Sequence, residues 1–164
     1  MPSNKVLLVN SDSCTGCMSC VMACAMFHEE VFDQTRSRIK IVKDEARCLA
    51  VPGICEQCEE SPCIGSCPVD AIQRNVETGL IEVDRETCTG CGACEKACSY
   101  SGVTVYNKER IALICDLCNG DPKCAEICVP QRAIQYVPDR ESMTSKRALL
   151  TKRAELLASM LEGR

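Results

Sequence analysis

The chain has 164 residues, a formal net charge of −4 and only 3% aromatic residues. Its length suits one domain or two small ones that share a core, and its acidic balance argues against nucleic acid as a partner. No apolar stretch approaches the roughly 20 residues that span a bilayer, and no signal peptide or twin-arginine pair is recognised, so we expect a cytoplasmic protein without a membrane span.

The first third of the chain predicts two strands and one helix. A short strand is expected within Lys5–Asn10, and a helix over Met18–Phe27. Arg38–Val42 alternates charged and apolar residues, which is typical of a half-buried strand. Val51-Pro52-Gly53 predicts a break in regular structure.

The middle of the chain predicts short strands between cysteine-rich loops. A helical turn ends near Cys67, and a strand starts at Ile72. A turn over Asn75–Gly79 leads into a returning strand over Leu80–Asp84. Residues 88–98 predict a loop followed by a helix, and residues 115–128 predict another. The remaining predicted strands are Val103–Tyr106, Arg110–Ile114 and Ala133–Val137.

Residues 138–164 contain no cysteine and predict an amphipathic helix. Its apolar residues recur at helical spacing and are Leu149, Leu150, Ala154, Leu157, Met160 and Leu161. Its charged residues lie mostly elsewhere around the helix and include Lys146, Arg147, Lys152, Arg153 and Glu155. Two interpretations stay open: the helix packs back on its own domain, or it docks onto a partner subunit.

Sixteen of the seventeen cysteines form four groups of four. The groups are Cys14, Cys17, Cys20 and Cys24; Cys55, Cys58, Cys63 and Cys67; Cys88, Cys91, Cys94 and Cys98; and Cys115, Cys118, Cys124 and Cys128. The first and third groups have the spacing of bacterial ferredoxin ligand runs for [4Fe–4S] clusters. The second and fourth lengthen only the middle gap. Four runs predict four [4Fe–4S] clusters and a role in electron transfer.

Other uses of cysteine fit this pattern poorly. A disulfide scaffold is disfavoured by the odd cysteine count, the repeated tight spacing and the expected cytoplasmic location. Structural zinc sites usually combine two separated C-x-x-C knuckles around one ion. A Rieske centre needs two histidines, and the chain has one. Because the chain has few aromatic residues, we expect the clusters to cross-link the fold and the cluster-free chain to be largely unfolded.

The start of the chain resembles a known family. The segment from Cys14 to Cys24 (CTGCMSCVMAC), with His28 and Ser37-Arg38-Ile39, is similar to four-cluster, ferredoxin-like subunits of molybdenum and tungsten oxidoreductases. It looks closest to small subunits of tungsten aldehyde oxidoreductase complexes. Similar chains serve benzoyl-CoA reductase, formate dehydrogenase, carbon monoxide dehydrogenase and dimethyl-sulfoxide-reductase-type enzymes. The resemblance covers roughly residues 4–137.

The expected fold is α+β, a duplicated bacterial ferredoxin-like fold with two pseudo-symmetric two-cluster modules and a C-terminal helix. Residues 1–50 and 108–137 would form an outer module that holds cysteine groups one and four. Residues 51–107 would form an inserted module with groups two and three, and residues 138–164 would form the helix, a candidate for partner docking.

The resemblance implies a crossed pairing, in which the fourth cysteine of each run binds the neighbouring cluster. Quartet 1 would be Cys14, Cys17, Cys20 and Cys128, and quartet 2 would be Cys55, Cys58, Cys63 and Cys98. Quartet 3 would be Cys67, Cys88, Cys91 and Cys94, and quartet 4 would be Cys24, Cys115, Cys118 and Cys124.

The expected function is that of a non-catalytic electron-transfer subunit in a hetero-oligomer. By resemblance, the main partner is a large pterin-containing tungsten or molybdenum subunit, with a flavoprotein or ferredoxin as a further candidate. No G-x-G-x-x-G fingerprint or other substrate site is present. The alternative is a free soluble polyferredoxin, whose acidic charge suits transient docking.

A few residues outside the cysteine groups have two readings. Cys48 predicts a small buried residue or an idle thiol, with a ligand role as the alternative. His28 predicts an ordinary helix-end residue, or a hydrogen-bond partner of a cluster sulfur. Gly16, Gly90 and Gly92 are predicted to let the backbone approach the cluster sulfides closely, with plain turn positions as the alternative, and both can hold.

Overall fold

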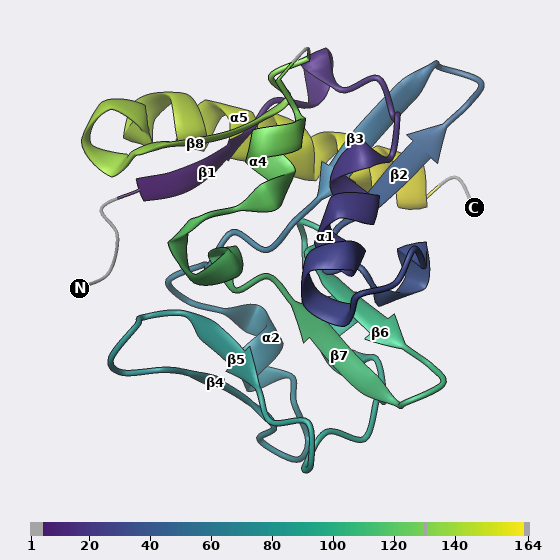
Figure 1. Ribbon diagram of the computed structural model, residues 1–164, viewed down its shortest axis with the longest axis vertical. Helices are drawn as coiled ribbons and strands as arrows, with labels where there is room; N and C mark the ends of the chain where they lie inside the picture. The colour runs from purple at the N-terminus through teal and green to yellow at the C-terminus, as the bar shows by residue number, and fades with distance from the viewer. Residues whose placement is uncertain (1–4, 130, 163–164) are drawn as a thin grey trace.

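The computed structural model describes residues 5–129 and 131–162 (Figure 1). The strands of this part of the chain pair into two-stranded antiparallel sheets. The pairs are β1 (Lys5–Val9) with β8 (Ile134–Pro138), β2 (Lys40–Asp44) with β3 (Leu49–Gly53), β4 (Ile72–Arg74) with β5 (Ile81–Val83), and β6 (Val103–Tyr106) with β7 (Ile111–Ile114). Residues 1–4, 130 and 163–164 of the predicted modules and helix lie outside the described residues.

Short helices connect these strands, and one long helix follows the last of them. The α-helices are α1 (Ser19–Glu29), α2 (Pro62–Gly65), α3 (Ala93–Ala97), α4 (Lys123–Ile127) and α5 (Asp139–Leu161). The 3₁₀ turns are η1 (Ser11–Ser13), η2 (Gln34–Arg36) and η3 (Leu117–Gly120). The predicted α+β class is confirmed, and most predicted strands and helices agree with the observed ones to within two residues.

Sheet β1–β8 joins the first strand of the described chain to the last. Lys5 lies opposite Pro138, and Val9 lies opposite Ile134. Strands β4 and β5 lie at the opposite end of the molecule, as Figure 1 shows. The two middle cysteine groups are therefore enclosed in sequence by the first and the last, but in space they lie beside them.

The predicted break at Val51–Gly53 is wrong, because these residues belong to β3. Pro52 lies opposite Ile41 in the β2–β3 hairpin. A two-stranded sheet has only edge strands, and an edge position tolerates proline because an outward-facing N–H is not needed for pairing. Gly53 packs tightly: a Cβ there would lie 2.5 Å from the carbonyl oxygen of Ser101.

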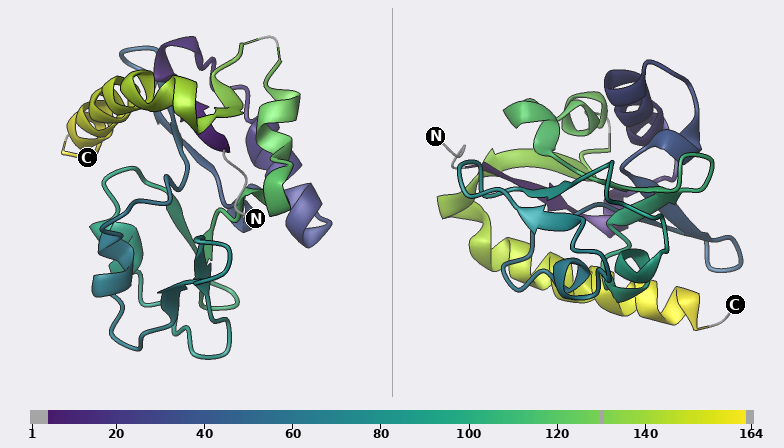
Figure 2. Two further views of the ribbon diagram at one scale, coloured as in Figure 1. Left: turned by 90° about the vertical axis from the view of Figure 1, so that its left-hand side faces the viewer. Right: turned by 90° about the horizontal axis from the view of Figure 1, so that it is seen from below.

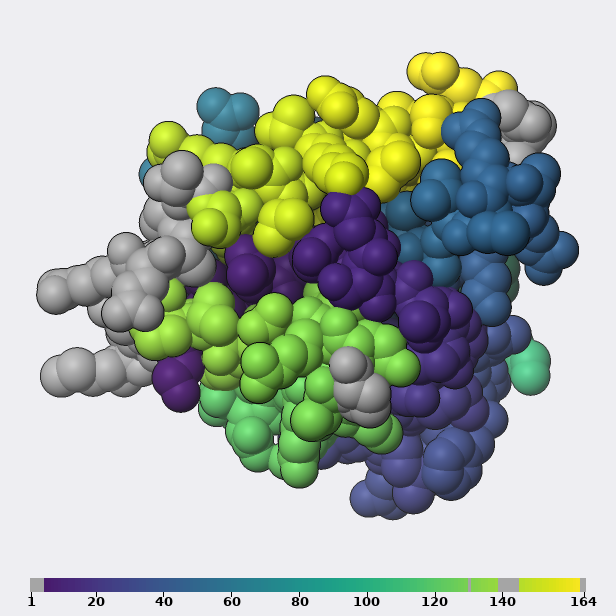
Figure 3. Space-filling view, turned by 90° about the horizontal axis from the view of Figure 1, so that it is seen from above, coloured from purple at the N-terminus to yellow at the C-terminus, as the bar shows by residue number. Residues whose placement is uncertain are grey.

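Helix α5 packs back on its own chain, which favours the first of the two interpretations of this segment. It lies along β1, β2, β3 and β8, and Figures 2 and 3 show it beside the N-terminal strand and the β2–β3 hairpin. Leu157 and Met160 are buried against Val51. Arg153, which the helical pattern placed away from the apolar side, is 1% exposed. Leu161, predicted to be on the apolar side, is 51% exposed.

The main core combines aliphatic residues with cysteines. Buried side chains such as Val21, Ile39, Ile54 and Ile72 pack in one cluster with several buried cysteines. These cysteines are Cys20, Cys24, Cys55, Cys63, Cys94, Cys115 and Cys124. Sulfur atoms thus occupy positions that larger hydrophobic side chains fill in most domains of this size.

Candidate metal centres

The sulfurs of quartets 1 and 4 meet where α1 packs against α4. Helix α1 carries Cys20 and Cys24, and α4 carries Cys124. The four cysteines of quartet 1 line a single cavity. Burial raises the pKa of Cys20 to about 12, and the nearby charges of Cys14 and Cys128 add to the rise. The first and last cysteine runs are therefore neighbours in space.

Quartet 4 gathers around Cys24. Burial is the main cause that raises the pKa of Cys115 and Cys124, and the charge of a neighbouring Cys24 thiolate raises both further. The same two causes act on Cys118. This mutual influence places the fourth cysteine of the first run beside the first three cysteines of the last run.

Quartets 2 and 3 are assembled around the pair of short helices α2 and α3, which pack together. Burial raises the pKa of Cys55 to about 12, and the charge of Cys98 adds to the rise. Cys98 acts in the same direction on Cys58 and Cys63. The four cysteines of quartet 3 line one cavity of their own.

The quartets form a row through the molecule. The charge of Cys20, in quartet 1, raises the pKa of Cys124, in quartet 4. The charge of Cys55, in quartet 2, raises the pKa of Cys115, in quartet 4. Because α2 and α3 join quartets 2 and 3, the order is 1, 4, 2, 3. Each end of the row reaches the surface, since both outer quartets contain an exposed cysteine and neither inner quartet does.

Backbone N–H groups point at several sulfurs and favour the thiolate form. The donor-to-sulfur distances are 3.4 Å from Gln57 to Cys55, 3.3 Å from Ala71 to Cys67, 3.2 Å from Gly102 to Cys98, 3.4 Å from Ala112 to Cys88 and 3.4 Å from Leu117 to Cys115. Gly102 is required for close packing as well, because a Cβ there would lie 2.6 Å from the Cα of Cys55.

These residues fit [4Fe–4S] clusters. Burial raises the pKa of Cys94 to about 11, so a buried thiolate at such a position needs a cation to compensate its charge. Four converging sulfurs with backbone donors meet the requirements of a cluster in number and in charge. The disulfide alternative gains no support, since all seventeen cysteines are free.

The predicted glycines act mainly through backbone conformation. Gly90 has a φ of +65°, and a Cβ there would lie 2.5 Å from the carbonyl carbon of Arg110. This position therefore needs glycine both for its left-handed turn and for a close approach to another loop. Gly16 and Gly92 also have positive φ.

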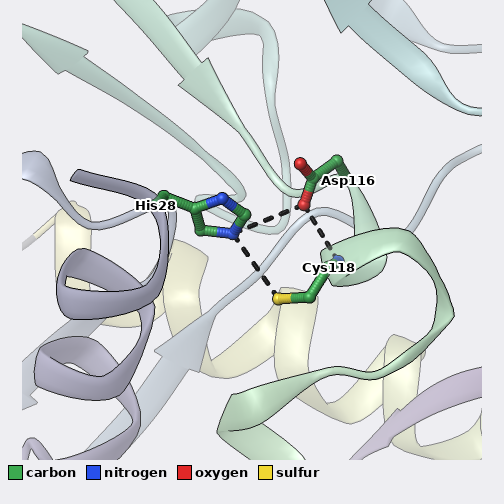
Figure 4. A group of neighbouring side chains, drawn as sticks. All are labelled: His28, Asp116 and Cys118. Carbon is green, nitrogen blue, oxygen red and sulfur yellow. Dashed lines mark hydrogen bonds and ion pairs between the residues drawn. The ribbon is translucent and has the colours of Figure 1, made fainter. Parts of the chain in front are cut away.

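His28 lies in the last turn of α1 and faces quartet 4 (Figure 4). Its Nε2 lies 3.5 Å from the Sγ of Cys118 and 3.4 Å from Oδ1 of Asp116. Arg38 contacts Nδ1 of the same ring and donates to Oδ2 of Asp116 at 2.9 Å. The second reading of His28, as a neighbour of a candidate ligand sulfur, agrees with this geometry.

The sequence analysis missed two acidic residues near the candidate ligands, Asp116 and Glu56. The side chain of Glu56 is 3% exposed and forms an ion pair with Arg153, and another at 3.3 Å with Lys146. The guanidinium of Arg153 also lies 5.2 Å from the ring centre of Tyr100. A signal was present, because Glu56 and Asp116 each follow the first cysteine of a lengthened group.

Cys48 lies away from the quartets, in the turn between β2 and β3. It is exposed, so the prediction of a buried residue is wrong, and the idle-thiol alternative remains. Its Sγ lies 3.8 Å from the carbonyl oxygen of Glu45. No helix in the described part of the chain is long and apolar enough to cross a membrane.

An α+β framework of hairpins around grouped cysteines defines a ferredoxin-like iron–sulfur protein. Residues 46–138 match the family model described as "4Fe-4S dicluster domain", and the chain belongs to this family. The presence of [4Fe–4S] clusters and an electron-transfer role follow from this membership. The match begins after the first cysteine group, which therefore lies outside the matched residues.

Two curated proteins are similar over most of their length. The polyferredoxin-like subunit of aliphatic sulfonate oxidoreductase from Pyrococcus furiosus is 37% identical over 122 residues, which cover 74% of this chain and 70% of that protein. The putative electron transport protein YsaA of Escherichia coli is 38% identical over 144 residues, which cover 80% and 88%.

A solved structure has the same fold. It is a chain of the active-site complex BamBC of benzoyl coenzyme A reductase in complex with zinc, with a TM-score of 0.50 and 24% identity. The match covers 96% of this chain and 97% of that one. The ferredoxin-like α+β fold with a C-terminal helix is thereby confirmed.

Proposed function

We propose that this protein is the electron-transfer subunit of an oxidoreductase complex and carries four [4Fe–4S] clusters. It relays single electrons between a large tungsten or molybdenum pterin subunit of the aldehyde oxidoreductase type and a second redox partner, such as a flavoprotein or ferredoxin. The main observation in support of this proposal is the row of four cysteine quartets, in which each outer quartet contains an exposed cysteine.

The sixteen grouped cysteines act as the ligands, in the crossed sets of quartets 1 to 4. A bound cluster supplies a centre that accepts and returns one electron without making or breaking substrate bonds. The protein holds the sulfurs, donates backbone N–H groups to them and excludes water from the inner quartets. The pairing of β1 with β8 supports an outer module of residues 1–50 and 108–137 around an inserted module of residues 51–107.

The names of similar proteins support a subunit role. The Pyrococcus relative is named as the subunit of an oxidoreductase, and the solved structure belongs to the complex of a reductase. The benzoyl-CoA reductase, formate dehydrogenase and carbon monoxide dehydrogenase classes are alternative hosts for the same kind of subunit. The large partner supplies the substrate site, because the quartets occupy this chain's core.

A free polyferredoxin is the second candidate function. The net charge of −4 and the exposed cysteines at both ends of the row suit transient contacts with soluble partners. The Escherichia coli relative is named an electron transport protein without reference to a larger complex.

Anaerobic purification from the native host tests the proposal. We expect brown protein with about sixteen irons and as many labile sulfides per chain, as four cubanes require. We also expect a large metal-containing chain to co-elute. Colourless protein without labile sulfide would refute the electron-transfer proposal. Brown protein that elutes alone as an active monomer would favour the free carrier.

Single cysteine substitutions test the crossed sets. Cys24→Ala should perturb the same electron paramagnetic resonance (EPR) signal as Cys124→Ala, because both remove a ligand of quartet 4. Cys20→Ala should perturb a different signal, although it lies on the same helix as Cys24. Cys48→Ala is the matched control and should leave iron content and all signals unchanged. The assignment fails if Cys24→Ala and Cys20→Ala alter one common signal.

A further inference from the structure

We propose that His28 donates a hydrogen bond from Nε2 to the Sγ of Cys118, and that this contact raises the reduction potential of quartet 4. The inference rests on the proposed function and deepens it, because it identifies a residue that tunes one cluster of the row. His28 acts as a positioning and tuning residue.

The tautomer of His28 follows from its neighbours. Arg38 contacts Nδ1, and a guanidinium has only donors, so Nδ1 must be the acceptor. In a neutral imidazole the proton then lies on Nε2. The side chain is only 9% exposed, which shields this arrangement from water.

The proton on Nε2 has two acceptors within reach, at 3.5 Å on Cys118 and 3.4 Å on Asp116. The carboxylate of Asp116 already accepts the backbone N–H of Cys118 at 2.9 Å on Oδ1. Its Oδ2 also accepts a hydrogen bond from the guanidinium of Arg38 at 2.9 Å. The Sγ of Cys118 has a hydrogen bond from one backbone N–H, that of Lys123, so it can still accept the proton on Nε2.

Arg38 reinforces the effect on a second ligand of the same quartet. Its backbone N–H donates a hydrogen bond to Cys24. Its guanidinium contacts His28 and Asp116, and both of these residues contact Cys118. Reduction adds one negative charge to a cluster, and donors and cations at its ligands stabilise the reduced state more than the oxidised one.

Quartet 2 provides an internal comparison. Glu56 occupies the position of Asp116, and Arg153 the role of Arg38 as its partner. The guanidinium of Arg153 is directed at Glu56 and at the carbonyl oxygen of Ile54. The chain has a single histidine, so no quartet but quartet 4 receives an imidazole donor.

The expected consequence is an energetic asymmetry in the row. Quartet 4 is buried and lies next to quartet 1, which has the exposed Cys17. With its potential raised, quartet 4 would hold an electron more readily than it would without His28, within one quartet of that surface.

Redox titration of the cluster-loaded protein, followed by EPR, tests the inference. His28→Phe should lower the midpoint potential of one cluster and leave the other three unchanged. His28→Gln keeps an N–H donor and should restore part of the shift. Met26→Leu is the matched control, because Met26 lies in the same part of α1, is 43% exposed and should leave all four potentials unchanged. Four unshifted potentials in His28→Phe would overturn the inference.

A second measurement needs no substitution. Because His28 is the only histidine, ¹⁵N-histidine labels one site in the whole chain. Pulsed EPR of the reduced protein should show a ¹⁵N coupling on one cluster signal, the same one that responds to Cys24→Ala. Absence of any such coupling overturns the inference even if the variants fail to fold.

The two levels of failure are distinguishable. Iron and labile sulfide are measured first on every preparation. Protein without four clusters refutes the proposed function, and this inference with it. Protein with about sixteen irons but without the shift or the coupling refutes the role of His28 alone.

Discussion

Arg153 and Glu56 form the most buried ion pair among the described residues. The two side chains are 1% and 3% exposed, and they tie α5 to the loop between Cys55 and Cys58. Removing one member of such a pair leaves an uncompensated charge in the interior. The pair therefore fixes the position of a ligand loop from a helix that carries no ligand.

Arg153→Met should destabilise the protein by about 3–5 kcal/mol, the usual cost of breaking a buried pair. The contact of Lys146 with Glu56 places the expected value near the lower end of this range. Lys152→Met is the matched control, because its pair with Asp12 is exposed at 52% and 58% and contributes about 0–1 kcal/mol. Anaerobic urea unfolding, followed by visible absorbance, measures both. Equal midpoints for the two variants would contradict the prediction.

The cysteine groups were predictable residue by residue, whereas the residues that support them were not. Ligand spacing is local in the sequence, so it can be read directly. The contacts of Glu56 with Arg153 and of Asp116 with Arg38 join segments far apart in the chain. When helix positions are assigned by polarity alone, Arg153 is placed in solvent. Such an assignment takes no account of its partner Glu56, which is distant in the sequence.

Helix α5 closes the face of the molecule formed by β1, β2, β3 and β8. Its position was left open by the sequence, since an amphipathic pattern predicts an apolar side but not the surface that covers it. The surface that α5 covers includes β3, which the sequence analysis did not predict as a strand because it contains Pro52 and Gly53. Short strands with breaker residues are recognised only when their partner strand, here β2, is considered with them.

Leu157→Ala should destabilise the protein by about 2–5 kcal/mol, because Leu157 is 1% exposed and fills the contact between α5 and Val51. Leu161→Ala on the same helix is the control: at 51% exposure it should change stability by about 0.5 kcal/mol or less. Thermal unfolding measured by circular dichroism compares them. If both variants unfold at one temperature, α5 contributes little to the fold.

The whole molecule is organised around its cysteines rather than around a core of large side chains. With 3% aromatic residues in the sequence and four small sheets in its described part, it has little else to hold the quartets together. When a metal centre cross-links a chain, its binding free energy becomes folding free energy. The clusters are therefore expected to be a condition for the fold.

Removal of iron with a chelator under anaerobic conditions should unfold most of the chain, because buried thiols then lose their cross-links and leave cavities. Far-ultraviolet circular dichroism should show loss of structure in step with loss of the visible absorbance. Re-addition of iron and sulfide serves as the control and should restore both signals. A cluster-free chain with an unchanged spectrum would show that the polypeptide alone specifies the fold.

The pairing of β1 with β8 bears on the synthesis of the protein. As the chain leaves the ribosome, Lys5–Val9 has no partner until Ile134–Pro138 has emerged. In the proposed crossed sets, quartets 2 and 3 are complete in a nascent chain that ends at Cys98, whereas quartets 4 and 1 must wait for Cys124 and Cys128. Cofactor insertion would then proceed from the proposed inserted module outward, and the thiols of the first run would stay without iron longest.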